Sequence, residues 1–158
     1  MAYFAPCLYA FGGSLAFAMV FNISKNKLLL SAIGGFIGQL TYLLFQFIIS
    51  NDVALSLLAT MAISLYAEMM ARVTKSPTTV YLAVALIPLV PGGGVYYTML
   101  DFIHNDIDLG ITTGLHTLGI SAALAMGIIL ISSSINLIRK VMLNRKRRKK
   151  ESAIPCKE

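Results

Sequence analysis

The sequence predicts an all-α, polytopic membrane protein with five transmembrane helices, the fourth of them broken at a proline- and glycine-rich motif. The first observation behind this prediction is composition: 57% of the 158 residues are hydrophobic and 13% are charged, whereas a soluble domain carries about 25% charged residues. The second is a series of five apolar runs of the length that a span needs, roughly 20 residues. The third is that every Lys and Arg lies outside these runs.

The five apolar runs are expected to form helices, because a backbone in hydrocarbon must satisfy its hydrogen bonds within its own segment. They cover residues 3–21, 28–49, 53–71, 79–100 and 111–138. The connections between them are short, and every charged residue except Glu68 lies in a connection or in the tail. The sequence therefore predicts a five-span transmembrane domain at residues 2–138 and a basic cytoplasmic tail at residues 139–158.

The distribution of charge predicts the orientation of the chain. All thirteen Lys and Arg residues lie in the first loop, the third loop and the tail, whereas the second and fourth loops hold acids and no bases. An excess of Lys and Arg marks cytoplasmic segments. We therefore expect a multi-pass protein of the plasma membrane with its N-terminus outside and its C-terminus in the cytoplasm. Eight of the bases lie between Arg139 and Lys150, and we expect this tail to contact anionic lipid headgroups and not nucleic acid.

Small residues recur at four-residue spacing in two of the runs. The positions are Gly34 and Gly38, Gly110 and Gly114, and then Gly119, Ala123 and Gly127. In lipid, such stripes let helix backbones approach one another closely. We expect them to pack within the chain's own bundle; docking to another membrane subunit is the alternative.

The fourth run holds the most informative motif of the sequence. Pro88 and Pro91 each remove a backbone donor and clash with the preceding turn of a helix. Gly92, Gly93 and Gly94 follow at once, and each is about 1 kcal/mol less favourable in a helix than Ala. The motif therefore predicts an interrupted helix. Unpaired backbone groups in hydrocarbon are costly, so the break should be buried in protein or line a polar cavity.

Broken helices near the membrane midplane form the solute sites of many secondary transporters. A half-helix that begins near Gly92 or Gly93 would present free N–H groups to a carboxylate, and carbonyls freed around Ile87 would suit a cation or an ammonium group. Tyr96 and Tyr97 come directly after and could donate hydrogen bonds or gate the site. The alternative is a kinked structural helix with close glycine packing.

Glu68 is the only carboxylate inside an apolar run. An intramembrane acid is a candidate for a proton or cation relay. On the expected topology it lies about one turn from the cytoplasmic end of its span, and Arg72 follows at the spacing of a helical ion pair. Two interpretations stay open: an acid paired with Arg72 in a structural role, or a residue that couples transport to an ion.

Other polar residues do not indicate enzymatic chemistry. Polar side chains inside or at the ends of the apolar runs are expected to make hydrogen bonds between helices; they are Asn22, Gln39, Tyr42, Tyr66 and His116. Neither His104 nor His116 has cysteine neighbours, so no metal site and no cofactor are expected. Nucleophile and phosphate-loop motifs are absent from the sequence. We therefore expect a protein that is not an enzyme.

Several of these segments together resemble the threonine/serine exporter family, in its C-terminal membrane half. The resemblance is most specific in IPLVPGGGVYYTM at residues 87–99, and AFAMVFN at 16–22, IGGFIG at 33–38 and EMMAR at 68–72 also fit. From the broken helix and the intramembrane acid described above, we expect substrate binding at Pro88, Pro91, Gly92, Gly93, Gly94, Tyr96 and Tyr97, with Glu68 as the coupling candidate.

The resemblance also implies a partner and a function. In that family two five-span halves, fused or split between two proteins, make the transporter, and the longer half begins with a cytoplasmic domain. We therefore expect this chain to be the small subunit of a secondary exporter of small carboxylate-bearing solutes such as threonine and serine, assembled with the larger five-span subunit or with copies of itself. The alternatives are export of small dicarboxylates such as succinate, and a non-transporting membrane scaffold or assembly protein.

Overall fold

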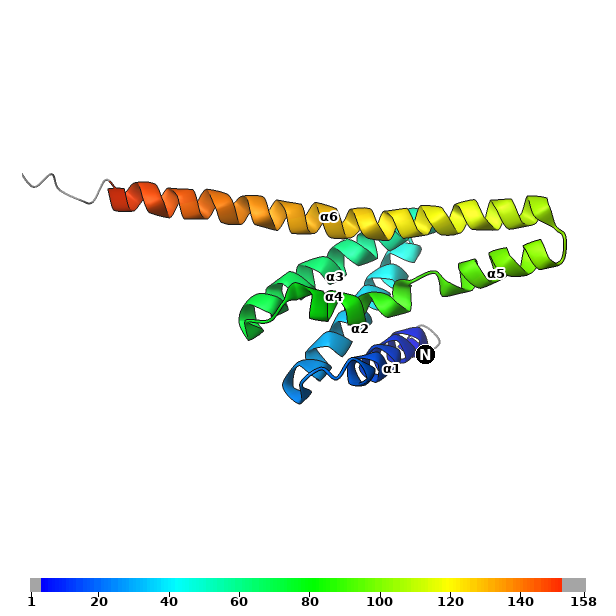
Figure 1. Cartoon of the computed structure of the whole chain (residues 1–158), viewed down its shortest axis with the longest axis horizontal. Coiled ribbons are helices and arrows are strands. Elements are labelled where there is room, and N and C mark those ends of the chain that lie inside the picture. Colours follow the sequence, from blue (N-terminus) through cyan, green and yellow to red (C-terminus); the bar gives the residue numbers. More distant parts are fainter. Residues whose placement is uncertain (1–3, 152–158) are drawn as a thin grey trace, which may run out of the picture.

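The fold was obtained as a computed structural model, which describes residues 4–151. Within that range the chain is all-α, as predicted, and contains no strand. Its elements are α1 (Phe4–Val20), α2 (Lys25–Gln46), α3 (Asp52–Thr74), α4 (Thr78–Leu86), the short 3₁₀ helix η1 (Ile87–Leu89), α5 (Gly92–Ile103) and α6 (Ile107–Glu151). Figure 1 shows α6 running along the length of the molecule with the other helices gathered on one side of it.

The helices follow the predicted apolar runs closely, except at the end of α6, which continues as a helix to Glu151 through most of the predicted tail. Residues 27–46, 52–74 and 107–142 lie in helices that are long and apolar enough to cross a membrane. The pair formed by residues 78–89 and 92–103 is bent by 49° and gives a fourth span if it crosses as one unit. The apolar part of α1, residues 5–20, is shorter. By length and composition the described chain therefore has three to four spanning helices.

Turn residues explain where the helices begin and end. The side chain of Asn51 caps α3 by accepting a hydrogen bond from the N–H of Val53 at 3.0 Å. At the other end of α3, Lys75 adopts a left-handed conformation with φ of 51°, and the N–H of Ser76 bonds back to the carbonyl of Ala71 at 3.0 Å. Asn105, with φ of 69°, makes the turn between α5 and α6. Asparagine tolerates this conformation better than most residues.

Helix α2 lies at the centre of the bundle and packs against α1, α3, α4 and η1. Its glycines make this possible. A Cβ atom on Gly34 would lie 2.9 Å from the Cβ of Ala85 on α4, and one on Gly35 would collide with the buried Ser14 of α1. A Cβ on Gly38 would overlap Ile63 of α3. The prediction that this glycine stripe packs within the chain's own bundle is therefore confirmed.

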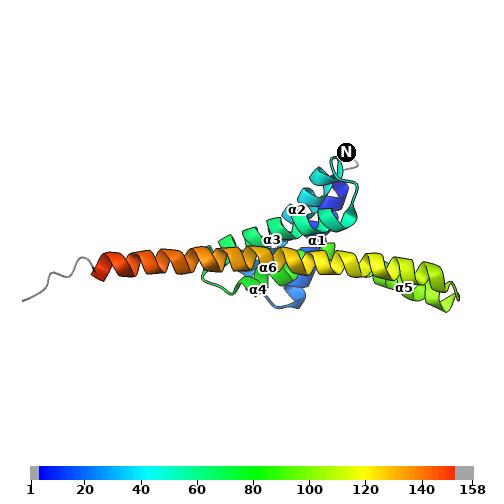
Figure 2. The same cartoon turned by 90° about the horizontal axis from the view of Figure 1, so that it is seen from above.

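Helix α6 packs across α3 and beside α5. A Cβ atom on Gly127 would lie 3.0 Å from the Cβ of Thr60 and 3.1 Å from the carbonyl oxygen of Leu57, so the second glycine stripe also serves packing inside the chain. In Figures 1 and 2 the hairpin of α5 and the first part of α6 extends away from the α1–α4 bundle. Its large apolar side chains are mostly exposed, as expected of a surface that meets lipid or another membrane subunit.

Candidate functional site

The Pro/Gly motif interrupts the helical ladder between Leu86 and Gly92. Since Pro88 has no N–H, the first turn after α4 tightens into the 3₁₀ helix η1, and the N–H of Val90 is shared between the carbonyl of Ile87 at 3.3 Å, the 3₁₀ bond, and that of Leu86 at 3.1 Å. Pro91 then has φ of −76° and ψ of 57°, which is the geometry of an inverse γ-turn. The hydrogen bond of that turn joins the N–H of Gly92 to the carbonyl of Val90 at 2.7 Å.

This turn leaves backbone groups without partners. In a continuous helix, the N–H groups of Gly92 and Gly93 would bond to the carbonyls of Pro88 and Leu89. Because Gly92 bonds to Val90 instead, those two carbonyls have no hydrogen-bond partner in the described part of the chain. The N–H groups of Gly93 and Gly94, in the first turn of α5, have none there either. The sequence predicted freed carbonyls around Ile87. In the structure they belong to the next two residues, Pro88 and Leu89.

The break borders an open cleft of about 390 Å³ between α1, α2 and η1. Its walls comprise Pro6, Tyr9, Ala10 and Gly13 of α1, Gln39 of α2, and Ile87 and Pro88 of η1. Among the described residues, the side-chain amide of Gln39 has no hydrogen-bond partner, so it is free to bind a group in the cleft. Sequence reasoning missed Tyr9, and for Gln39 it expected a hydrogen bond between helices, which is not formed among the described residues. Only the fold brings these two residues beside the motif.

The three consecutive glycines have different surroundings. A Cβ atom added to Gly92 or Gly93 would meet nothing within 4 Å. A Cβ atom added to Gly94 would overlap the Oγ1 atom of Thr117 on α6 and lie 3.1 Å from its Cγ2. Gly94 is therefore needed for the contact between α5 and α6, whereas Gly92 and Gly93 leave the start of α5 open.

Tyr96 and Tyr97 lie on the surface of α5, with 63% and 58% of their area exposed. Their rings touch each other edge to face, with centroids 5.4 Å apart. Neither side chain lines the cleft beside Pro88. In this single chain the tyrosines are therefore placed to meet a molecule outside it, and the predicted solute-gating role stays a prediction.

Glu68 lies apart from the break, at a cleft between α3 and α6 whose lining shares no residue with the cleft at Pro88. Arg72, Lys75 and Arg139 line the same region as Glu68. The expected ion pair between Glu68 and Arg72 is not formed: no carboxylate oxygen of Glu68 lies within 4.0 Å of the Arg72 side-chain nitrogens. The interpretation of Glu68 as an Arg72-paired acid was therefore wrong.

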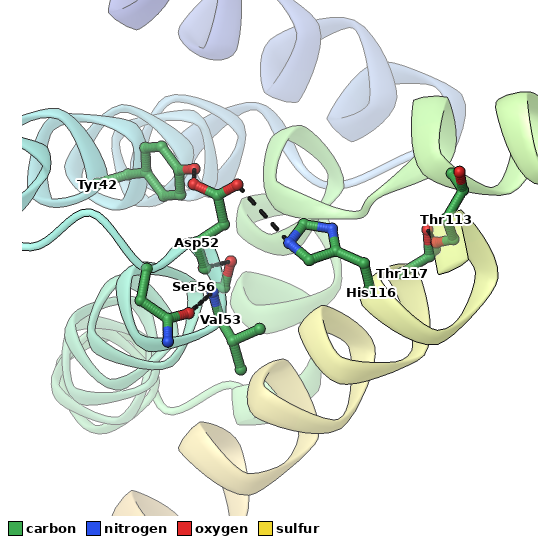
Figure 3. A network of polar contacts seen from close by, with 8 residues as sticks. Tyr42, Asp52, Val53, Ser56, Thr113, His116 and Thr117 are labelled. Atoms are coloured by element: carbon green, nitrogen blue, oxygen red, sulfur yellow. Dashed lines mark hydrogen bonds and ion pairs between the residues drawn. The ribbon is translucent and has the colours of Figure 1, made fainter. Parts of the chain in front are cut away.

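A polar cluster joins three helices at the start of α3 (Figure 3). The hydroxyl of Tyr42 on α2 donates a hydrogen bond to one carboxylate oxygen of Asp52 at 3.3 Å, and the other oxygen lies 3.8 Å from Nε2 of His116 on α6. Asp52 and His116 are about half exposed. The Tyr42 bond and the bond from the Tyr66 hydroxyl to the carbonyl of Leu30 at 2.8 Å confirm the hydrogen bonds between helices expected for these two tyrosines. His116 lies beyond hydrogen-bond distance of Asp52, so the hydrogen bond expected for it is not formed with any described residue.

Comparisons with known proteins are consistent with these features. A protein-family model described as "Threonine/Serine exporter, ThrE" matches residues 6–134, which include every helix up to the middle of α6 and the whole Pro/Gly motif. Neither a curated protein nor a solved structure matches the chain. Within the described residues, no three His, Cys, Asp or Glu side chains cluster as metal ligands would.

Proposed function

Because this chain belongs to the threonine/serine exporter family, we propose that it is a membrane subunit of a secondary transporter that exports small carboxylate-bearing solutes such as threonine and serine. Family membership and the apolar helices make it a multi-pass membrane protein.

The interrupted α4–α5 helix is the observation that carries the proposal. Unpartnered N–H groups at a helix N-terminus suit a carboxylate, and carbonyls at unwound backbone suit an ammonium group. The break has both kinds of group, at Gly93 and Gly94 and at Pro88 and Leu89. A free amino acid carries both complementary charges. We therefore assign solute binding to Pro88, Pro91, Gly92, Gly93 and Gly94, with Tyr96 and Tyr97 as gating side chains.

We further propose that the chain crosses the membrane five times. Helices α2, α3 and α6 supply three spans, and the bent pair of α4 and α5 supplies one. The fifth is α1, whose 17 residues extend about 26 Å at the rise of an α-helix. That length is slightly less than the hydrocarbon thickness of about 30 Å, a mismatch that local thinning of the bilayer accommodates.

The charge distribution supports an N-terminus outside and a C-terminus in the cytoplasm. Cysteine accessibility tests this in a Cys156→Ser background, since the remaining Cys7 is fully buried. A cysteine at Ser50, in the α2–α3 turn, should react with an impermeant maleimide in intact cells. A cysteine at Lys75, in the α3–α4 turn, should react only after the cells are permeabilised. The reverse pattern would overturn the orientation.

The exposed surfaces of the α5–α6 hairpin support the proposal of a partner subunit. Gly92 and Gly93 border open space, and the neighbouring tyrosine rings are exposed. A solute site at the break would need further walls. We propose that the larger five-span exporter subunit, which begins with a cytoplasmic domain, supplies these walls; a second copy of this chain is the alternative. Co-purification of the two proteins from a membrane extract tests the pairing, and a chain that purifies and transports alone would refute it.

Glu68 is the coupling candidate of this proposal. It is the only carboxylate in the interior of an apolar helix, and it has no ion partner among the described side chains. A Glu68→Gln variant should lose the dependence of export on the proton gradient while solute exchange across the membrane continues. Retention of gradient-driven export would remove Glu68 from the mechanism.

The decisive experiment measures efflux of labelled threonine, serine and succinate from cells that contain this chain and the larger subunit. Gly93→Leu should abolish threonine and serine efflux, because the side chain fills the open start of α5 without a clash in the chain. Gly12→Leu is the matched control, since Gly12 on α1 also borders open space and lies outside the cleft. Unimpaired efflux by Gly93→Leu would refute the site.

The same measurement separates the alternatives. Efflux of succinate alone would assign the protein to dicarboxylate export. The scaffold alternative predicts two results. Cells that contain both proteins export none of the three solutes, and cells that lack this chain also lack the larger subunit in their membranes.

A further inference from the structure

A cleft between the C-terminal end of α3 and the second half of α6 combines a charged recess with an apolar groove. The recess, of about 560 Å³, is lined by Arg72 and Lys75 from the end of α3 and by Arg139 from α6, with hydroxyl and amide groups around them. The groove, of about 340 Å³, is lined by Leu65, Met69, Ile135, Ile138 and Met142. Glu68, Arg72 and Arg139 line both parts, so the two parts are continuous.

The two helices present matching faces to this cleft. On α3 the lining residues are Leu65, Glu68, Met69 and Arg72, and on α6 they are Ile135, Ile138, Arg139 and Met142. Both sets follow the spacing i, i+3, i+4, i+7, which is one face of an α-helix. Each face combines apolar residues with one arginine, Arg72 on α3 and Arg139 on α6, and both arginines also line the recess. The left-handed turn at Lys75 then closes the recess from the end of α3.

The charge in the recess is unbalanced. Three cations face one carboxylate, Glu68. Among the described side chains, none of the three cations has an ion partner within 4.0 Å. Basic residues near the C-terminal end of α3 interact favourably with the dipole of that helix. This interaction does not account for Arg139, which belongs to α6, or for the apolar groove beside the recess. The recess is therefore suited to an anion that brings an apolar part with it.

We propose that this cleft binds an anionic phospholipid, with its phosphate held between Arg72, Lys75 and Arg139 and its acyl chain lying in the groove between α3 and α6. Basic pockets between transmembrane helices are a known way of binding anionic headgroups. A free phosphate or solute anion would leave the apolar walls at Leu65 and Ile135 uncovered, whereas a phospholipid covers both parts. The site is separate from the interrupted helix and does not depend on which solute the protein carries.

Lipid retention measured by native mass spectrometry of the purified full-length protein tests the proposal, with phosphatidylglycerol and phosphatidylcholine as probes. Phosphatidylglycerol should be retained preferentially. Arg139→Gln should weaken its binding about fivefold, the effect expected for one Lys or Arg near an anionic headgroup. Lys140→Gln is the matched control: it removes the same charge one residue away on α6, at a position that is exposed and lies outside the cleft. It should change binding by less than twofold.

Two further variants keep the test informative if Arg139→Gln disturbs folding. Glu68→Gln removes the one negative charge from the recess and should strengthen phosphatidylglycerol binding several-fold, a gain that misfolding cannot produce. Ile138→Ser should weaken binding of the lipid and leave the weak binding of glycerol phosphate unchanged. Three results would each overturn the proposal. The first is an equal effect of Arg139→Gln and Lys140→Gln on phosphatidylglycerol binding, and the second is equal retention of the two lipids. The third is that glycerol phosphate competes for the site as strongly as phosphatidylglycerol does.

Discussion

Replacement of Gly94 by alanine tests whether the interrupted helix is held against α6 in the way the structure shows. An added Cβ atom at Gly94 would overlap Oγ1 of Thr117 and approach its Cγ2 to 3.1 Å and its Cβ to 3.3 Å. Thr117 is buried, and its hydroxyl donates a hydrogen bond to the carbonyl of Thr113 at 2.7 Å. The threonine therefore cannot move aside without losing that bond.

The expected magnitude follows from two opposing effects. Alanine is favoured over glycine in a helix by about 1 kcal/mol, while forcing an extra methyl group into a packed contact costs about 1–3 kcal/mol. Gly94→Ala should therefore lower the free energy of unfolding by up to about 2 kcal/mol. Gly93→Ala should be stabilised by the same helix preference of alanine and should have no clash, because nothing lies within 4 Å of its added Cβ. The difference between these neighbouring variants, about 1–3 kcal/mol, isolates the packing effect.

Equilibrium unfolding of the purified protein in mixed micelles, followed by circular dichroism, measures these free energies. Thr117→Ala removes the two atoms closest to the added methyl group, so the double variant Gly94→Ala with Thr117→Ala should recover at least about 1 kcal/mol relative to the sum of the single changes. Equal stabilities of Gly93→Ala and Gly94→Ala, or strict additivity of Gly94→Ala and Thr117→Ala, would refute the packing of α5 on α6 described here.

Three further substitutions can be measured by the same unfolding assay. Tyr66→Phe removes the hydrogen bond to the carbonyl of Leu30 and should lower stability by about 0.6 kcal/mol, a typical value for such bonds in membrane proteins; no change would argue against this contact. Ser64→Ala removes a buried hydroxyl that has no partner among the described residues, so stability should stay constant or rise by up to about 1 kcal/mol; a clear loss would reveal a partner. Asp52→Asn should lower stability by less than about 1 kcal/mol, because its contact with His116 is half exposed, and the effect should vanish at high salt.

Much of the fold was predictable from the sequence. The apolar runs at 3–21, 28–49 and 53–71 correspond to α1, α2 and α3 within a few residues, because polar residues such as Asn51 and Asp52 interrupt the apolar pattern between two helices, here at the beginning of α3. The interruption after Leu86 was also predictable, since a proline removes its own backbone donor wherever it stands.

The glycine stripe of α2 was predicted to pack within the bundle, but its individual contacts were not. Gly34 faces α4, Gly35 faces α1, and Gly38 faces α3. A four-residue spacing predicts that one face of a helix consists of small residues. It does not predict which other helix packs against that face. The contact of Gly94 with Thr117 was missed for the same reason, since in the sequence this glycine cannot be distinguished from Gly92 and Gly93.

The candidate sites show a similar division. The motif from Pro88 to Gly94 could be found in the sequence because its effect on the backbone is local. The cleft beside it could not, because Tyr9 and Gln39 come from helices about 50 to 80 residues away in the chain. The pairing of Glu68 with Arg72, one of the two interpretations that spacing left open, is not formed. That Arg139 of α6 lines the same cleft is revealed only by the fold.

By itself the sequence determined which segments are helices, where the fourth apolar run is interrupted, and which ends of the runs carry positive charge. These properties depend on backbone chemistry and on hydrophobicity within a few residues. Only the tertiary structure decided which side chains surround the break, that Gly93 is open while Gly94 is packed, and that three cations from α3 and α6 face the same recess. Such features arise where helices distant in the chain meet, and their geometry depends on side-chain shapes from both helices, which the pattern of either one alone does not contain.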